Sequence, residues 1–238
     1  MLSYNNIAYL KKAVDSVLNQ THENLELVIG DDGSTDGSWE LAERLAQKNQ
    51  RIKAFQNEKR LGIVKNRHAT FLKTSGEYIC HLDGDDELYP YSIQTMLEHM
   101  QGEDVALGVS DNAWIDSNSK VTGYCVNKEP SGNLSETGWR HFGMYKRWAY
   151  DQTDGYNTKI IHACEDGDLF MQIADKFKCV KVPVVLYKYR CHDKNTSHES
   201  KGGKCGECNE RPVCNFVRIW SKHAKYDPIT FTPLKEQG

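Results

Sequence analysis

The chain has 238 residues, of which 39% are hydrophobic, so it can form one large domain with a buried core and an appendage. Its formal net charge of -3 gives no sign of a polyanion-binding surface, and we expect no nucleic-acid partner. Since the sequence lacks a long apolar span and a signal-type start, we expect a cytoplasmic protein.

The first predicted elements are a helix and a buried strand. Apolar residues at helical spacing predict a helix over residues 7–19. The nearly continuous apolar run at 25–30 is typical of a strand buried on both faces. Only three residues precede Tyr4, so we expect a short first strand and a recorded start that is truncated or late.

Helix and strand patterns then alternate along the chain. In order, we predict a helix, strand, helix, strand, helix and strand at residues 36–49, 52–55, 63–73, 77–82, 92–100 and 105–110. Strands that alternate with helices through short connections favour a parallel sheet with right-handed crossovers. After Asp116 the sequence becomes turn-rich. The first half therefore predicts a doubly wound α/β domain.

Two groups of acidic residues follow predicted strands. Asp31 and Asp32 end the strand at 25–30, and four carboxylates lie within residues 83–87. Ligands of such sheets collect outside the carboxyl ends of the strands. Crowded carboxylates repel one another unless a cation compensates them, and oxygen ligands suit Mg²⁺ or Mn²⁺. The pattern alone leaves a second interpretation open, in which these acids cap the following helix and face water.

Two other classes of acidic site fit the sequence less well. An EF-hand is excluded because the sixth position counted from Asp83 is Leu88 instead of glycine. A phospho-receiver domain also sets acids at strand ends, but it would have about half this length and would leave everything after Asp116 unexplained.

Four stretches of the sequence carry a family resemblance. They are LSYNNIAYLKKAVDSVLNQTHENLELVIGDDGSTDGS, RLGIVKNRHATFLKTSGEYICHLDGDDELYP, CEDGDLFMQIAD and LYKYRCHDKNTS, which together cover most of residues 2–198. In this order they resemble family 2 of the inverting glycosyltransferases with the GT-A fold. The resemblance implies an α/β, Rossmann-like, mostly parallel central sheet flanked by helices, with a smaller acceptor-side region.

On the nucleotide side, the resemblance implies roles for five residues. Asp32 matches the family acid that hydrogen-bonds the base, with Asp31 as its neighbour and Tyr4 in the turn beside the base. Asp83 matches the acid near the ribose. The family's Ala-Arg-Asn element is matched to residues 64–66, so we expect Lys65 to replace an arginine contact to the phosphates or base.

The resemblance also implies a metal ligand set and a catalytic base. Asp85 matches the direct ligand of the divalent ion, Mn²⁺ or Mg²⁺, in the family's Asp-x-Asp element. His192 matches a late histidine that joins the metal or diphosphate in some relatives; an ordinary histidine at a strand end is the alternative. Asp166 matches the base that takes the proton of the acceptor hydroxyl. Glu165 and Asp166 also suit the first turn of a helix.

The resemblance therefore implies an enzyme. We expect a metal-dependent inverting transferase that moves a sugar from a nucleotide-sugar donor, a UDP-sugar, to a hydroxyl of a glycan or lipid-linked acceptor. The alternative is a non-catalytic module that binds a nucleotide-sugar or glycan on the same fold. The donor sugar is not readable, because Trp139, Trp148 and Tyr156 can either stack on a sugar or belong to the core.

We expect a GT-A domain over residues 1–198, with a nucleotide-binding half at 1–116 and an acceptor-side half at 117–198. A cysteine-containing extension at 199–238 follows.

The extension carries half of a zinc-ribbon pattern. Cys205, Cys208 and Cys214 have the spacing C-x₂-C-x₅-C, which suits structural Zn²⁺ or, alternatively, free or oxidised thiols. The basic, aromatic segment at 216–226 suits peripheral association with a membrane or packing onto the domain.

Overall fold

The structure, a computed structural model, describes residues 1–126, 142–158 and 165–192. The helices in these ranges are α1 (Ile7–Leu18), α2 (Ser38–Lys48), α3 (Ile63–Phe71), α4 (Ser92–His99), α6 (Arg147–Tyr150) and α7 (Glu165–Ala174). The strands are β1 (Leu2–Ser3), β2 (Leu27–Asp31), β3 (Ile52–Gln56), β4 (Tyr78–Cys80), β5 (Glu87–Leu88), β6 (Val105–Ile115), β7 (Val121–Cys125), β8 (Gly143–Lys146) and β9 (Lys178–Arg190).

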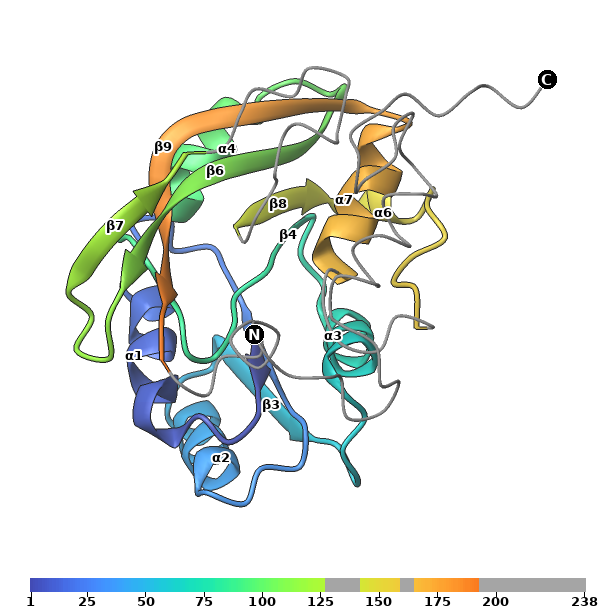
Figure 1. The fold of residues 1–238 in the computed structure, drawn as a ribbon. Coiled ribbons are helices and arrows are strands. Elements are labelled where there is room, and N and C mark those ends of the chain that lie inside the picture. Colours follow the sequence, from blue (N-terminus) through green and yellow to red (C-terminus); the bar gives the residue numbers. More distant parts are fainter. Residues whose placement is uncertain (127–141, 159–164, 193–238) are drawn as a thin grey trace, which may run out of the picture.

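The N-terminal elements form a small parallel sheet in the order β1-β2-β3. Every residue of β2 is buried, as the continuous apolar run predicts. In Figure 1 this sheet lies between α1 and α2 on one side and α3 on the other. Alternate residues of β2 therefore pack on opposite layers: Leu27 and Ile29 join the core with α1, while Gly30 faces Thr70 of α3.

A second, curved sheet has the order β4-β8-β6-β9-β5, with β7 paired to β6. The long strands β6 and β9 run parallel to each other, while the other pairs in this sheet are antiparallel. Figure 1 shows β6 and β9 arching over the smaller sheet. The α/β class is confirmed, but parallel pairing covers fewer strands than the alternation of elements predicts, because β4 pairs with the distant β8.

The two sheets meet at the start of the acidic loop, which is residues 83–87. Leu2 of β1 forms a parallel bridge with Asp83, and the backbone N–H of Gly84 donates to the carbonyl of Leu2 at 2.8 Å. A Cβ on Gly84 would lie 2.6 Å from that carbonyl oxygen and 2.1 Å from the amide nitrogen of Asn6. The glycine therefore allows the acidic loop to lie directly against β1.

The predicted helices and strands are present, with shifted ends. The predicted face of α1 buries Leu10, Val14 and Val17, although Ile7 at the helix start is exposed. The strand predicted at 105–110 continues to Ile115, because its polar residues are buried between neighbouring strands. Strands on both sides of residue 116 share the curved sheet, since β6 pairs with β8 and β9.

Some predictions concern residues outside the described ranges. These are Trp139, the extension at 199–238 and its candidate zinc ligands Cys205, Cys208 and Cys214. Among the described cysteines, Cys80, Cys125 and Cys179 are free thiols.

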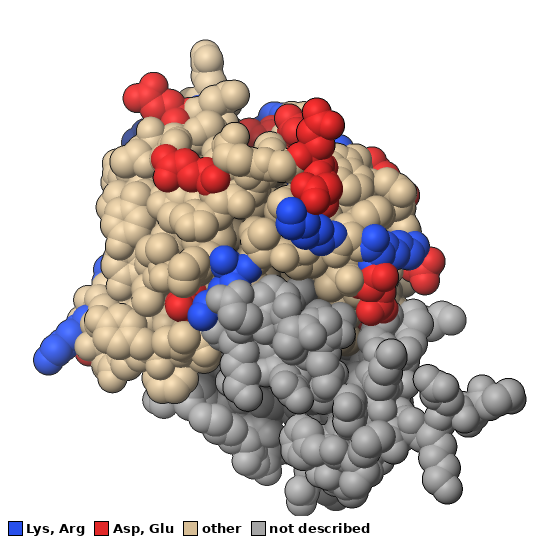
Figure 2. Space-filling model, turned by 90° about the horizontal axis from the view of Figure 1, so that it is seen from above, with Lys and Arg blue, Asp and Glu red and all other residues tan. Residues whose placement is uncertain are grey.

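One face of the described residues is mixed in charge. On the face in Figure 2, lysine and arginine side chains lie scattered among aspartate and glutamate side chains. None of the helices in the described ranges is long and apolar enough to cross a membrane.

Candidate active site

The candidate site forms where β1, β2 and the loop after β4 end side by side. Ser3 pairs with Asp31 in the parallel register, and Leu2 pairs with Asp83. Both acidic groups predicted from the sequence therefore lie at one edge of the small sheet, as expected for the carboxyl ends of adjacent parallel strands. This edge is the rim of the candidate site.

Asp31 is fully buried beneath this edge. Its carboxylate accepts hydrogen bonds from Ser3 Oγ at 3.0 Å and from the backbone N–H and Oγ of Ser34 at 2.8 and 2.6 Å. Ser34 Oγ in turn accepts a hydrogen bond from the backbone N–H of Asn5 at 2.9 Å. Asp31 therefore fixes the Tyr4-Asn5 turn from below, and its own oxygens are engaged inside the protein.

Asp32 anchors the neighbouring loop, residues 57–62. Its carboxylate accepts hydrogen bonds from the backbone N–H groups of Leu61 and Gly62 at 2.8 and 2.9 Å, and from Asn57 Nδ2 at 3.0 Å. The same loop carries Arg60, whose guanidinium carbon lies 4.2 Å from the ring centroid of Tyr4. Tyr4 is 40% exposed, so this cation–π pair forms an open, planar corner at the rim.

Arg67 joins two acidic segments that are far apart in the sequence. This arginine of α3 is buried; its Nε donates to Glu165 Oε1 at 2.7 Å and its Nη2 donates to Asp83 Oδ1 at 3.0 Å. Burial disfavours its charge, but Glu165 and Asp83 outweigh burial and raise the Arg67 pKa well above its usual value. Arg67 therefore stays cationic and brings the acidic loop to the start of α7.

Asp85 and His192 meet at the outer side of the same loop. His192 Nε2 lies 2.9 Å from Asp85 Oδ2, and their side chains are 14% and 24% exposed. Asp83 is 33% exposed. The side chains of His192, Asp85 and Asp83 are therefore all partly exposed to solvent at the rim.

The next two acids of the loop point inward. Asp86 accepts hydrogen bonds from the backbone N–H of Arg190 at 2.7 Å and from the Tyr187 hydroxyl at 2.6 Å. Burial raises the Asp86 pKa well above its usual value, and the neighbouring Asp85 and Asp83 charges add to this effect. Glu87 forms an ion pair with Arg190. These two acids belong to the scaffold of the loop.

Asp166 lies in the first turn of α7, beside the Arg67 bridge. Its Oδ1 accepts a hydrogen bond from the backbone N–H of Gly167 at 2.8 Å. Burial raises the Asp166 pKa, opposed by Arg67 and the Gly167 N–H group, while the nearby charge of Asp83 raises it further. A half-buried carboxyl group with a raised pKa is a suitable proton acceptor.

The neighbouring acid Asp168 has a different environment. It is buried and its Oδ2 accepts a hydrogen bond from Gln172 Nε2 at 2.8 Å. Gln172 also donates to the carbonyl of Gly155 at 3.1 Å. Asp168 therefore stabilises the packing of α7.

Sequence matching assigned the arginine position of the family element to Lys65. In the structure Lys65 is exposed and makes no hydrogen bond or ion pair with the described residues, while Arg67 contacts Asp83. The signal for Arg67 is helical spacing: Val64 and Phe71, both buried, are seven residues apart on α3 and flank Arg67 on the same face. A charged residue on a buried helix face requires a partner.

Of the candidate sugar-stacking aromatics, Tyr156 lies inside the domain and Trp148 is half-buried. Tyr156 is buried, and its hydroxyl lies 2.7 Å from His81 Nε2 and 2.9 Å from the Tyr145 hydroxyl. Trp148 packs edge-on against Phe177, with centroids 4.9 Å apart. For Tyr156 the core alternative is confirmed.

The side chains at the rim fit a hard divalent cation in part. Asp85 and His192 converge, and Asp83 adds a carboxylate nearby, but the described residues hold no group of three or more histidine, cysteine or acidic side chains that could hold a metal alone. Mg²⁺-type sites commonly use one or two carboxylates and complete their shell with water and substrate phosphates. The donor set therefore fits a cation that a diphosphate helps to bind.

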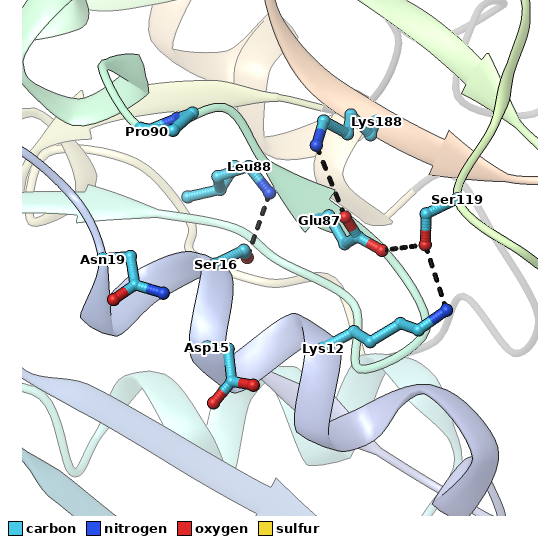
Figure 3. Close-up of a pocket in the computed structure, with 9 residues that line it drawn as sticks. All are labelled: Lys12, Asp15, Ser16, Asn19, Glu87, Leu88, Pro90, Ser119 and Lys188. Atoms are coloured by element: carbon cyan, nitrogen blue, oxygen red, sulfur yellow. Dashed lines mark hydrogen bonds and ion pairs between the residues drawn. The ribbon is translucent and has the colours of Figure 1, made fainter.

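A separate polar pocket lies beside the acidic loop, on the α1 side. It measures about 300 Å³, and Lys12, Asn19, Glu87 and Lys188 are among its lining residues. Figure 3 shows these side chains, with Glu87 between Lys188 and Ser119. Asp83, Asp85 and Asp166 do not line this pocket.

Comparison with known proteins gives a consistent family. The model of the family described as Glycosyl transferase family 2 matches residues 1–165. Hyaluronan synthase from Pasteurella multocida is 30% identical over 217 residues, which cover 84% of this chain and 21% of that protein. The chain spans between 20% and 34% of the length of the first curated relatives that it matches.

Two solved structures share the fold at low sequence identity. S. aureus TarS 1-349 in complex with UDP-GlcNAc has a TM-score of 0.66 at 17% identity, covering 92% of this chain and 62% of that chain. GalNAc-T7 with UDP, GalNAc and Mn²⁺ has a TM-score of 0.68 at 16% identity, covering 92% of this chain and 47% of that chain. Both likenesses support the GT-A fold expected from the family resemblance.

Proposed function

The chain belongs to glycosyl transferase family 2, and we propose that it transfers a sugar from a nucleotide-sugar donor to an acceptor hydroxyl with inversion at the anomeric carbon. One observation carries this proposal. Arg67 bonds both Asp83 and Glu165, so the acidic loop and the Glu165-Asp166 pair, which are separated by about eighty residues, meet at one point. Such a meeting of a phosphate-side acid and a candidate base is what the transfer requires.

The donor is proposed to be a UDP-sugar. Tyr4 and Arg60 form a planar corner on which a base can stack, and Asp32 lies behind it as the proposed partner of the base. Asp31 supports the same corner through Ser34 and Asn5. The TarS structure contains UDP-GlcNAc, which supports a uridine nucleotide here. Lys65, exposed on the first turn of α3, remains a proposed phosphate contact.

The proposed cofactor is Mn²⁺ or Mg²⁺. Asp85 and His192 would bind it, with Asp83 close to the ribose and diphosphate. The Mn²⁺ in the GalNAc-T7 structure supports a divalent ion in this fold. When bound, the cation stabilises the negative charge that develops on the departing diphosphate.

Asp166 is the proposed general base. Its carboxylate takes the proton of the acceptor hydroxyl while that oxygen bonds to the anomeric carbon. The bond from this carbon to the diphosphate oxygen breaks, and its electron pair leaves with the nucleoside diphosphate. Because the hydroxyl attacks from the opposite face, the configuration inverts. Glu165, held by Arg67, fixes the first turn of α7, which carries Asp166.

The proposed acceptor is a growing glycan or a lipid-linked sugar. A synthase of hyaluronan is among the relatives, which supports a role in polysaccharide biosynthesis. A cytoplasmic location, peripheral contact with a membrane and the division into residues 1–198 and 199–238 stay predictions.

Release of UDP tests the proposal. Purified protein is mixed with UDP-GlcNAc and other UDP-sugars, with and without Mn²⁺ and oligosaccharide acceptors, and free UDP is measured. We expect Mn²⁺-stimulated release that an acceptor increases. If donors bind but no combination yields UDP above the protein-free rate, the non-catalytic module is correct and the transferase proposal fails.

A further inference from the structure

The end of β9 holds the acidic loop through a fully buried arginine. Arg190 Nε donates to the carbonyl oxygen of Asp85 at 2.7 Å, and Nη2 forms an ion pair with Glu87. Nη1 donates to the carbonyl of Asp116 at 2.8 Å, in the turn between β6 and β7. The Arg190 side chain therefore links the backbone of Asp85, a candidate metal ligand, to the turn between β6 and β7.

The backbone of β9 adds contacts to the same loop. The N–H group of Arg190 donates to Asp86 Oδ1 at 2.7 Å, and the Tyr187 hydroxyl donates to Asp86 Oδ2 at 2.6 Å. The backbone N–H of Asp83 donates to that hydroxyl at 3.4 Å. Asp83, Asp85 and Asp86 thus all contact residues 187–190.

Glu87 is itself held from the pocket side. Figure 3 shows its carboxylate between Lys188 Nζ, at 3.4 Å, and Ser119 Oγ, at 2.5 Å. The Ser119 hydroxyl also accepts a hydrogen bond from Lys12 Nζ at 3.2 Å. The partner of Arg190 is therefore fixed, so the guanidinium has little freedom to move.

Tyr9 of α1 connects this arginine to the histidine at the rim. The Arg190 guanidinium carbon lies 4.7 Å from the centroid of the Tyr9 ring, and the His192 ring centroid lies 4.9 Å from it at an interplanar angle of 36°. His192 reaches Asp85 Oδ2 at 2.9 Å. Tyr9 therefore packs against Arg190, at the end of β9, and against His192, just after it. Both of these residues contact Asp85.

We propose that Tyr9 and Arg190 are positioning residues that set the geometry in which Asp85 and His192 bind a divalent cation. This inference rests on the proposed function. Asp85 and His192 are more than a hundred residues apart, so neither fixes the other through the chain. Partners that orient metal ligands without touching the metal typically change metal affinity by about 10–100-fold when they are removed.

The test is a calorimetric titration of UDP at a series of Mn²⁺ concentrations. In Tyr9→Leu, the Mn²⁺ concentration that gives half-maximal UDP affinity should rise about 10-fold, because the His192 ring loses its packing surface. Tyr9→Phe keeps the ring and should stay within about 2-fold of wild type. The matched control is Tyr124→Leu, since Tyr124 is 62% exposed on β7 and should leave the Mn²⁺ requirement unchanged.

Arg190→Lys provides a second arm, because lysine keeps the charge but cannot make the forked contacts to Asp85, Glu87 and Asp116. Its far-UV circular dichroism should match wild type while the Mn²⁺ requirement rises. A folded Tyr9→Leu with the wild-type Mn²⁺ requirement overturns this inference alone. If wild type itself shows no Mn²⁺-dependent UDP binding, the proposed metal site fails together with it.

Discussion

The two acidic groups at the rim lie in different environments. Asp31 and Asp32, at the end of β2, are buried and accept hydrogen bonds from side chains and backbone N–H groups of adjacent loops. Asp83 and Asp85 remain partly exposed. The same difference separates two neighbours in the acidic loop, because Asp86 is only 1% exposed whereas Asp85 is partly exposed. A carboxylate whose acceptor sites are engaged inside the protein, such as that of Asp31 or Asp86, supports the scaffold, whereas a partly exposed one can bind a ligand.

The largest effect should follow from removal of the candidate base. Asp166→Asn keeps the size of the side chain but cannot take a proton, so transfer should fall by about 10²–10⁴-fold while UDP affinity stays near wild type. Steady-state kinetics with UDP calorimetry separates the two.

The control is Asp151→Asn, because Asp151 is an exposed acid just after α6. It should transfer at the wild-type rate. A fully active Asp166→Asn variant would place the base at another residue.

Removal of a scaffold acid should reduce stability. Asp31→Ala leaves the donors of Ser3, Gly33 and Ser34 without their acceptor, which should lower the free energy of unfolding by about 2–4 kcal/mol. Urea denaturation measures this loss. An Asp31→Ala protein of wild-type stability would show that Asp31 is not a scaffold residue.

The pH dependence of folding stability should distinguish the buried Asp86 from the partly exposed Asp83 and Asp85. Its pKa is higher in the folded than in the unfolded chain, so the folded state binds the proton more tightly and stability falls as pH rises from the unfolded pKa towards the folded one. Each pKa unit of difference corresponds to about 1.4 kcal/mol. Asp86→Asn, which resembles the neutral carboxyl, should flatten this decrease from about pH 4 upward.

Urea denaturation at several pH values is the measurement. Asp86→Asn should also keep its Mn²⁺-dependent UDP affinity, in contrast to a change at Asp85. An unchanged pH slope would mean that Asp86 is ionised in the folded protein.

The smallest effect is expected at the planar corner formed by Tyr4 and Arg60, on which the nucleotide base is proposed to stack. Arg60→Ala removes the guanidinium from the exposed Tyr4 ring, and exposed cation–π contacts contribute about 0.5–1 kcal/mol. UDP affinity should therefore fall about 2- to 5-fold in a calorimetric titration. Lys59→Ala, in the same loop, is the control. Equal affinities for wild type and Arg60→Ala would remove this pair from the donor site.

The sequence predicts the layers of the fold and the position of the acidic groups. It does not predict which of these acids are buried and which remain exposed to a ligand. The spacing of Leu10, Val14 and Val17 defines the buried face of α1, and the Asp-x-Asp element points to Asp83 and Asp85. Neighbouring acids in a loop share no period, so their sequence does not reveal that Asp86 turns inward. The bridge made by Arg67 and the pairing of β9 with β6 join distant segments, and local patterns carry no information on such partners.

The central claim is that Asp85 binds a divalent cation that carries the donor diphosphate. Calorimetric titration of UDP in the presence of Mn²⁺ tests it with wild type, Asp85→Asn and the control Asp104→Asn, whose acid is exposed and pairs only with Lys178 among the described residues. Asp85→Asn should lose about 10–100-fold in Mn²⁺-dependent UDP affinity, while Asp104→Asn should match wild type. Equal Mn²⁺-dependent affinities for all three proteins would contradict the claim.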